Sequence, residues 1–244
     1  IGTQFNNQNY NSLTVKAEKR FTQGFTFLSS FTWSHNIDFG DENLFQGATG
    51  QNLFTYDQSL DRGNASLDRR LAYVLSYVYE LPFGTGKRWA TEGAARWIFG
   101  GWQIGGILSL LDGTPNGHTT IDTTNVGGAN RGDTIRDPNL PPSERTIDLW
   151  FDKDAIVPGQ PGKLDQAGRN LIVGPATKNF DFSVARRFTL PWEGHSLQFR
   201  FESFNFTNSP IFGTPNTSIN NAAAATINTA DEPRRIQFGL KYVF

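Results

Sequence analysis

Three histidines and a run of aspartates are the residues of this chain whose types could support catalysis or metal binding. His35 follows a predicted strand, His118 lies in the longest predicted connection, and His195 lies in a short predicted turn. Metal sites use ligands at characteristic spacings, and no two of these histidines have such a spacing. We therefore interpret all three as ordinary exposed or interfacial side chains, and the sequence predicts no catalytic residue, metal site or cofactor.

The segment from Asp112 to Lys178 could bind calcium, because carboxylates beside backbone carbonyls are the oxygen ligands that this ion prefers. Its aspartates are interspersed with glycine, asparagine and proline, and those after Asp112 are Asp122, Asp133, Asp137, Asp148, Asp152, Asp154 and Asp165. The calcium-loop pattern of alternating aspartates, a central glycine and a final glutamate does not occur among them. We interpret the segment as a solvated loop.

Three further motifs have simple structural interpretations. The glycines of Gly84–Arg88 suggest a phosphate loop, but they lack the spacing of that motif, so the segment is predicted to be a turn. The triplets Asp61–Gly63 and Asp68–Arg70 are interpreted as charged residues of a loop and of a strand start, with contact to a substrate or a neighbouring domain as the functional alternative. Ala222–Ala225 is a short low-complexity stretch without chemistry.

These residues must be positioned by β-strands, because apolar and polar residues alternate with a period of two along much of the chain. The clearest example is the last segment, in which Ile236, Phe238, Leu240, Tyr242 and Phe244 share one face. The predicted strands are Tyr10–Phe21, Phe25–Trp33, Leu71–Leu81, Trp102–Leu111, Phe180–Phe188, Leu197–Asn205 and Arg234–Phe244. The last strand has the roughly 9–11 residues that a tilted strand needs to cross a bilayer.

The connections between the predicted strands segregate by length. In order they are short, long, medium, very long, short and long, and they cover residues 22–24, 35–70, 82–101, 112–178, 189–196 and 207–233. If the C-terminus is periplasmic, every long connection is extracellular, which is the arrangement of outer-membrane barrels. Unstructured connections beyond about 12–15 residues are uncommon in compact soluble domains. The pattern therefore predicts an all-β, antiparallel transmembrane β-barrel.

The two faces of the predicted wall differ in chemistry. The outward face is apolar, with aromatic residues such as Trp33, Trp102 and Trp192 near strand ends, where interfacial girdles lie. The inward face is polar and is predicted to line a lumen; its charged residues include Lys16, Glu18, Arg20, Glu80, Arg200 and Glu202. Lys19 and Arg186 fall on the outward face near short turns, where we expect their long side chains to snorkel to the headgroups.

Composition excludes several classes of protein. With 37% hydrophobic residues and a mean hydropathy of -0.43, the chain has no run of roughly 18 apolar residues that could form a membrane helix. The net charge of -1 gives no field to attract nucleic acid. The absence of cysteine fits an exported bacterial protein and leaves no disulfide or thiolate metal site. The chain has no methionine and begins with Ile1, so we interpret it as a processed or truncated piece.

Several stretches carry, by their order and spacing, a resemblance that spans most of the chain. They are Tyr10–Leu13, Phe25–Asn36, Asp68–Arg70 leading into Leu71–Phe83, Gly101–Gly106, Phe201–Asn208 and the terminal strand ending in Phe244. On these residues the chain resembles the C-terminal β-barrel portion of TonB-dependent outer-membrane receptors, and most closely the Oar-like subgroup.

This resemblance implies a barrel of about 22 strands, with an N-terminal plug and an energy-coupling box. About seven or eight strands are expected here, the eighth only if residues before Tyr10 supply it, and single-chain bacterial barrels have an even number. Residues 1–244 are therefore expected to be the C-terminal segment of a larger barrel, with the plug domain and N-terminal strands absent. In that context Asp61–Gly63 and Asp68–Arg70 could contact the plug.

The resemblance further implies a receptor in the bacterial outer membrane that takes up a bulky nutrient, either a small molecule or an oligomer. Its expected partners are membrane lipid and lipopolysaccharide, the barrel-insertion machinery, and an inner-membrane energy-coupling protein that acts through the plug. Nucleic acid is not an expected partner. Leu240, Tyr242 and Phe244 would form the assembly signal, because the last strand of such proteins ends in an aromatic residue.

Two other classes of function are weighed against transport. An outer-membrane barrel hydrolase could use His118 with an aspartate or serine, but the sequence contains no such motif. A structural or adhesive surface barrel would only display its loops. We favour transport and expect the chain not to be an enzyme.

Overall fold

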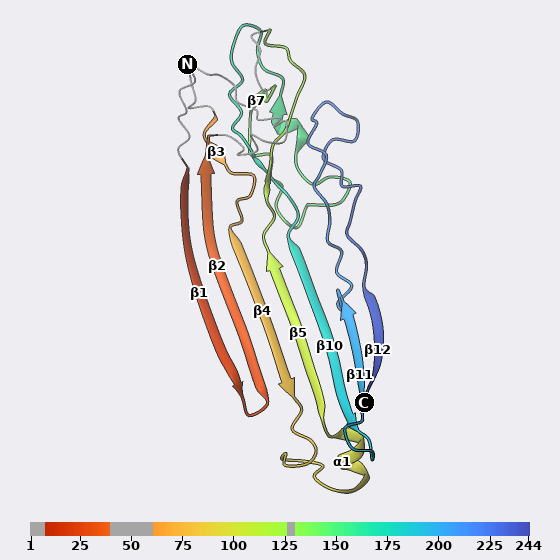
Figure 1. Ribbon diagram of the computed structural model, residues 1–244. Coiled ribbons are helices and arrows are strands. Elements are labelled where there is room, and N and C mark those ends of the chain that lie inside the picture. The colour runs from red at the N-terminus through yellow and green to blue at the C-terminus, as the bar shows by residue number, and fades with distance from the viewer. Residues whose placement is uncertain (1–7, 40–60, 126–129) are drawn as a thin grey trace.

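The computed structural model describes residues 8–39, 61–125 and 130–244, and its main feature is a sheet of long neighbouring strands (Figure 1). Their bounds are β1 Asn9–Thr22, β2 Phe25–Asp38, β4 Leu71–Glu80, β5 Trp102–Leu111, β10 Thr177–Thr189, β11 Ser196–Phe204 and β12 Arg235–Val243. Each strand predicted from the alternation is present. The largest difference is in β2, which continues to Asp38, so His35 lies within the strand and does not follow it.

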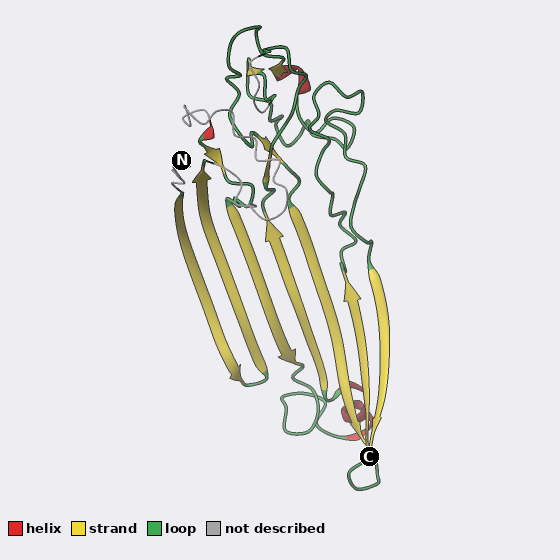
Figure 2. Ribbon diagram, turned by 45° about the horizontal axis from the view of Figure 1, so that its top comes forward, coloured by secondary structure: helices red, strands yellow, loops and turns green. Residues whose placement is uncertain are grey.

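Each long strand pairs antiparallel with its neighbours, and the sheet has the order β1, β2, β4, β5, β10, β11 and β12. The two-residue strand β3 (Gly63–Asn64) extends the sheet beside the end of β2. Among the described residues no pairing joins β1 to β12, so the sheet is open with two edges (Figure 2). The predicted all-β antiparallel sheet of seven to eight strands is confirmed. A further strand before Tyr10 would involve residues 1–7, which lie outside the described residues.

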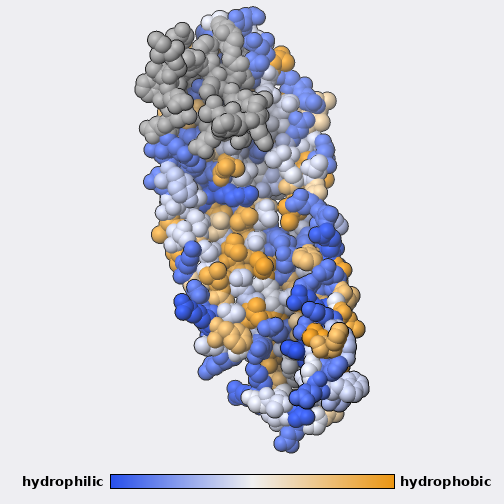
Figure 3. Space-filling view, in the orientation of Figure 1, coloured by the Kyte–Doolittle hydropathy of each residue, from blue (hydrophilic) through white to orange (hydrophobic). Residues whose placement is uncertain are grey.

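The register of the ladders carries one apolar face across the whole sheet. Phe31 of β2 lies opposite Tyr73 of β4, and Phe201 of β11 lies opposite Phe238 of β12. A slip of one residue in any ladder would interrupt this face, because successive side chains point to opposite sides of a strand. In Figure 3 apolar residues gather over the middle of the view, and hydrophilic residues are more frequent toward both ends.

Many large apolar side chains of this face are exposed, most of all on the edge strands β1 and β12, and those of the inner strands are half-buried. The exposed fraction is 56% for Val15 of β1, and 72% for Phe238 and 69% for Leu240 of β12. A sheet normally buries its apolar face against a second layer of the same protein, and a contiguous exposed apolar surface marks contact with a partner or a membrane. A partner or a membrane, outside the described residues, must therefore cover this face.

The short connections lie at one end of the sheet, near the C-terminus, and the long connections lie at the other (Figure 1). The β1–β2 hairpin is closed by Gln23 and Gly24, which both have positive φ angles, 53° and 78°, as a type I′ turn requires. The connection from β4 to β5 contains helix α1 (Gly93–Phe99), which strand alternation does not predict. Among the described helices, none has the length and apolarity to span a membrane.

The long connections form a folded unit, and this corrects the prediction of a solvated loop. We call the described residues 61–70, 112–176 and 205–234 the loop unit. Its short elements are β6 (Pro115–Asn116) paired with β9 (Ile172–Val173), β7 (Asp133–Thr134) paired with β8 (Ile156–Val157), and the 3-10 helix η2 (Lys153–Ala155). Phe151, Ile156 and Ile172 pack with Ile219 and Ala225 in a buried core. Ala225 belongs to the stretch that the sequence indicates as low-complexity and without chemistry, and it is 0% exposed.

Candidate functional site

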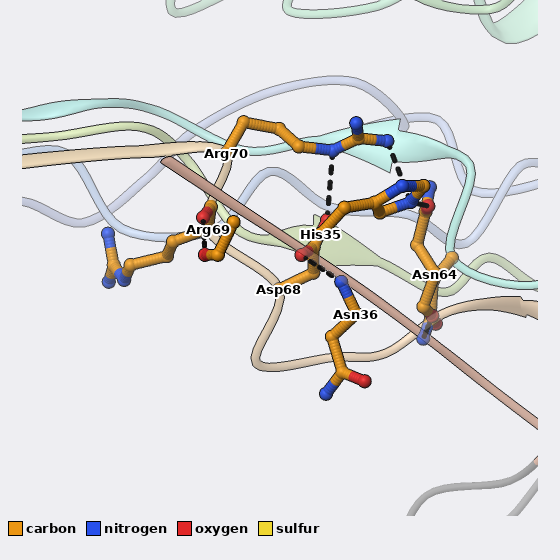
Figure 4. Close-up of polar contacts among 8 residues, drawn as sticks. His35, Asn36, Asn64, Asp68, Arg69 and Arg70 are labelled. Atoms are coloured by element: carbon orange, nitrogen blue, oxygen red, sulfur yellow. Dashed lines mark hydrogen bonds and ion pairs between the residues drawn. The ribbon is translucent and has the colours of Figure 1, made fainter. Parts of the chain in front are cut away.

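A polar cluster joins the end of β2 to the segment that leads into β4 (Figure 4). Asp68 is buried; its Oδ1 accepts a hydrogen bond from the backbone N–H of Asn36 at 2.7 Å, and its Oδ2 accepts one from Nε of Arg70 at 3.1 Å. Nη2 of Arg70 lies 2.9 Å from Nε2 of His35, and that nitrogen lies 3.2 Å from Oδ1 of Asn64. Charge-assisted hydrogen bonds are stronger than neutral ones, so this cluster fixes the strand ends on which the loop unit rests.

Two buried ion pairs stabilise the loop unit, and the second connects it to the sheet. Arg131 is 0% exposed, and its Nη2 lies 2.6 Å from Oδ1 of Asp61. Arg169 pairs with Asp38, the last residue of β2, and its Nε donates to the backbone carbonyl of Asp61 at 3.2 Å. Buried charges are tolerated only when they are paired and hydrogen-bonded. Asp61, predicted to be an ordinary charged loop residue, is therefore part of the buried framework.

His118 is buried beside the Arg131–Asp61 pair, which corrects the prediction of an exposed or interfacial histidine. Its Nε2 lies 3.0 Å from the carbonyl oxygen of Arg131, so this nitrogen carries the proton, while Nδ1 has no hydrogen-bond partner among the described residues. Burial lowers the pKa of His118, and the charge of Arg131 also lowers it. The Arg131 carbonyl and the nearby Asp165 act in the opposite direction. An imidazole enclosed in this way gives a substrate no access.

We expect acidification to loosen the loop unit around His118. Because its pKa is lower in the folded state than in the unfolded chain, the unfolded state binds more protons between the two pKa values. The stabilising contribution is therefore complete above about pH 6.5 and is lost as the pH falls toward the folded-state pKa. Amide hydrogen exchange of residues 118–133, compared above and below this pH and corrected for intrinsic rates, measures the effect.

The matched variant for this prediction is His118→Asn, which keeps a polar side chain but does not titrate. Its exchange rates should depend less on pH than those of the wild-type protein. Equal pH dependence in both proteins would contradict the role given to His118.

A cavity of about 820 Å³ lies between the loop unit and the end of the sheet. One wall is Trp150, whose Nε1 donates to the carbonyl oxygen of Val173 at 2.8 Å and whose ring centre lies 5.6 Å from the guanidinium carbon of Arg145. Other lining residues are Arg70, Asp112, Pro142, Lys178 and Phe212. Apolar walls with a few convergent polar groups are typical of binding sites.

Several aspartates of the long connection accept hydrogen bonds in turns or form ion pairs. Oδ1 of Asp122 accepts hydrogen bonds from the backbone N–H and Oγ1 of Thr124, which lower the pKa of Asp122. Asp152 pairs with Arg136 at 2.6 Å. In the part of the chain that the structure describes, no group of three or more histidine or carboxylate side chains is placed to hold a metal ion.

The sheet, its exposed apolar face and the segregated loops correspond to a known family. A family model described as an outer membrane beta barrel domain matches residues 2–237. The chain belongs to this family. No curated protein and no solved structure matches the chain.

In an outer membrane beta barrel domain of the bacterial outer membrane, an apolar face such as this one contacts lipid. The charged residues predicted for the lumen lie on the opposite face. Ion pairs join Glu18 to Arg20 at 3.6 Å, Glu80 to Lys87 at 2.9 Å and Arg200 to Glu202 at 3.4 Å, while Lys16 lies opposite Ser30. That this polar face lines a lumen stays a prediction.

The residues predicted to signal assembly lie on the apolar face of β12. Leu240 and Tyr242 pair with residues of β11, and the rings of Tyr242 and Phe244 are stacked with centroids 5.8 Å apart. The hydroxyl of Tyr242 contacts Nδ1 of His195, which places this histidine in the turn between β10 and β11 as predicted. Phe244 is 88% exposed and contributes little packing to the folded chain.

Deleting Phe244 is expected to reduce insertion into the outer membrane much more than it lowers stability in detergent. A terminal side chain with this exposure adds little to the free energy of unfolding, whereas an insertion machinery would read the aromatic end. The fraction of folded full-length protein in outer membranes and the urea midpoint of refolded protein measure the two effects. Phe244→Tyr, which retains a terminal aromatic ring, is the control, and unchanged insertion after the deletion would show that Phe244 is incidental.

Sequence reasoning missed the buried arginines and the walls of the cavity. The sequence offered only local signals. Arg131 precedes a glycine and Arg169 precedes an asparagine, residue types that favour turns. In the structure Gly132 and Asn170 have positive φ angles of 66° and 53°, so each arginine stands at a sharp backbone turn. The apolar pair Trp150–Phe151 inside a polar connection was a second signal, because large apolar residues in a long loop indicate a satellite core.

Proposed function

We propose that this chain is part of a TonB-dependent outer-membrane transporter of the Oar-like type, which takes up a bulky nutrient. The observation that carries the proposal is the cavity of about 820 Å³ between the loop unit and the sheet. Its walls belong to a unit with its own core and buried ion pairs, so the cavity is preformed. Preformed concave sites with few polar groups are the usual sites for ligands, and a barrel that only displays loops does not require one.

The chemistry of the cavity favours a nutrient that combines a ring with an anionic group. Trp150 offers an aromatic surface, while Arg145 and Lys178 bring positive charge to the same space. Lys178 is exposed and has no ion pair within the described ranges. The carboxylate of Asp68, by contrast, already forms an ion pair with Arg70. A ligand with a carboxylate or phosphate would therefore meet cations that remain available.

Within this proposal an inner-membrane energy-coupling protein acts through a plug domain elsewhere in the protein, and lipid, lipopolysaccharide and the barrel-insertion machinery are the membrane partners. We assign no catalytic role to the chain. The hydrolase alternative needs an accessible base, and His118 is 1% exposed with its protonated nitrogen facing a backbone carbonyl. No specific observation favours an adhesive surface barrel.

The proposal is tested by uptake into cells that carry the full-length protein. Labelled oligosaccharides, oligopeptides and metal chelates are supplied with and without the inner-membrane energy-coupling protein. Uptake that requires both the receptor and the coupling protein supports TonB-dependent transport, and uptake independent of the coupling protein contradicts it.

The role of the cavity is tested in the same cells. Trp150→Leu should raise the ligand concentration needed for half-maximal uptake, because it removes the aromatic wall. Trp192→Leu is the control, since Trp192 is 64% exposed in the turn between β10 and β11, away from the cavity. Equal uptake by the wild-type protein and Trp150→Leu would contradict the cavity as the binding site.

A further inference from the structure

Helix α1 presents a cluster of apolar side chains that the barrel wall does not bury. The exposed fraction is 68% for Trp97, 53% for Ile98 and 55% for Phe99, and none of the helix's seven residues is buried. Helices this short are not stable in water by themselves. The helix therefore requires a surface on which its apolar residues are covered.

The helix is attached to the lipid-facing side of the sheet by Arg186. This arginine lies in the apolar row, opposite Trp102 of β5 and Phe199 of β11. Its Nη1 donates to the carbonyl oxygen of Ile98 at 2.7 Å, and its Nη2 donates to the carbonyl oxygen of Trp97. Nε1 of Trp102 also donates to the carbonyl of Ile98, at 2.9 Å. The last carbonyls of a helix have no partner within the helix, and here the barrel wall supplies the donors.

The charge of Arg186 is enclosed by aromatic rings. Its guanidinium carbon lies 4.2 Å from the ring centre of Phe188, 5.3 Å from that of Trp102 and 6.0 Å from that of Trp97. Cation–π contacts strengthen when water is excluded. The guanidinium of Arg186 thus binds the last turn of α1. That this side chain reaches the level of the headgroups stays a prediction.

We propose that α1 is an in-plane membrane anchor, with Trp97, Ile98 and Phe99 inserted into the phospholipid leaflet on the side of the short connections. The apolar surface of the helix continues the lipid-facing surface of the sheet through Arg186 and Trp102. Arg96 within the helix and Arg88, shortly before it in the sequence, are exposed cations. Aromatic residues beside cations are the combination that binds the boundary between phosphate groups and acyl chains, at a depth of about 5–10 Å. The anchor is independent of the proposed transport function.

The test measures the depth of residue 98 in the full-length protein, reconstituted in vesicles of phosphatidylethanolamine and phosphatidylglycerol. A spin label is placed at Ile98→Cys in a background with no other cysteine, and its accessibility to oxygen and to a water-soluble nickel complex is compared. Leu240→Cys on the lipid face and Leu67→Cys in the loop unit, where Leu67 is 84% exposed, are the references. We expect the Ile98 label to favour oxygen strongly over nickel, near the headgroup boundary. Nickel accessibility equal to that of the Leu67 label would overturn the proposal.

A second pair of variants tests the attachment. Arg186→Gln removes the charge and one arm of the guanidinium, whereas Arg186→Lys keeps the charge but cannot hold two carbonyls at once. In Arg186→Gln the Ile98 label should move toward water, and in Arg186→Lys the shift should be smaller. An unchanged label in a folded Arg186→Gln protein would overturn the role of Arg186, and if that variant does not fold, the depth of the label in the wild-type background still decides the membrane contact.

Discussion

Asp61→Ala should destabilise the loop unit by about 3–5 kcal/mol, the cost of removing one partner from a buried ion pair. The substitution leaves the guanidinium of Arg131, which is 0% exposed, buried without the carboxylate that lies 2.6 Å from it. Arg131 holds the carbonyl that binds His118, so the loss should spread through this part of the loop unit. Native-state hydrogen exchange of the loop unit, compared with that of the sheet, measures the change.

Two matched changes separate the buried charge from simple loss of contacts. The double variant Asp61→Leu with Arg131→Met replaces the pair with apolar side chains and should recover much of the stability, because neither member of the pair is left as a buried charge without its partner. Arg136→Ala breaks a pair of the same 2.6 Å length in which Arg136 is exposed, and it should have little effect. If Arg136→Ala costs as much as Asp61→Ala, burial is not the reason for the effect.

Leu75→Arg should lower the stability of the membrane-inserted protein by about 2–4 kcal/mol, the cost of a cation near the middle of the lipid face of a barrel. Phe199→Arg should cost less, because Phe199 lies opposite Leu240 and Arg186, nearer the short connections, where the cost of a cation falls. Leu75 belongs to the apolar rows and lies opposite Ser29 and Leu108. An arginine there must enter hydrocarbon or distort the bilayer around it. Urea unfolding of the protein in lipid vesicles measures the cost.

The controls are one residue away on the opposite face. Ser76→Arg and Gln198→Arg introduce the same side chain on the face that is turned away from lipid. Across the ladders Ser76 lies opposite Leu28 and Ile107, and Gln198 lies opposite Arg187 and Lys241. They should be tolerated far better. Similar costs on both faces would mean that the apolar face does not contact lipid.

The loop unit and the sheet of this chain are stabilised in different ways. The loop unit has a buried core of its own, with Phe151 and Ile172 at 0% exposure. The sheet has its largest apolar side chains on the outside, as with Phe238 at 72%. Loss of lipid should therefore affect the sheet, whereas loss of a buried charge pair should affect the loop unit.

The sequence by itself determined the strands, their faces and the class of protein. A period of two is a local property: the alternation of Leu197, Phe199 and Phe201 with Gln198 and Arg200 requires a strand with two different sides wherever the strand is placed. A slip of one residue would move an apolar row to the polar face, but a slip of two would not, so the exact registers come from the tertiary structure. The segregation of short and long connections is also visible in the sequence, and it is what separates a membrane barrel from a soluble sheet.

Only the tertiary structure decided how the connections fold and which polar residues they bury. Arg131 meets Asp61, and Arg169 meets Asp38, across separations that no local pattern encodes. A charged residue in a polar loop looks the same in the sequence whether it is solvated or buried, because burial depends on chain segments that are distant in sequence. Helix α1 could not be predicted for the same reason. The last turn of the helix, which carries the exposed Trp97, is held by Arg186 of a distant strand.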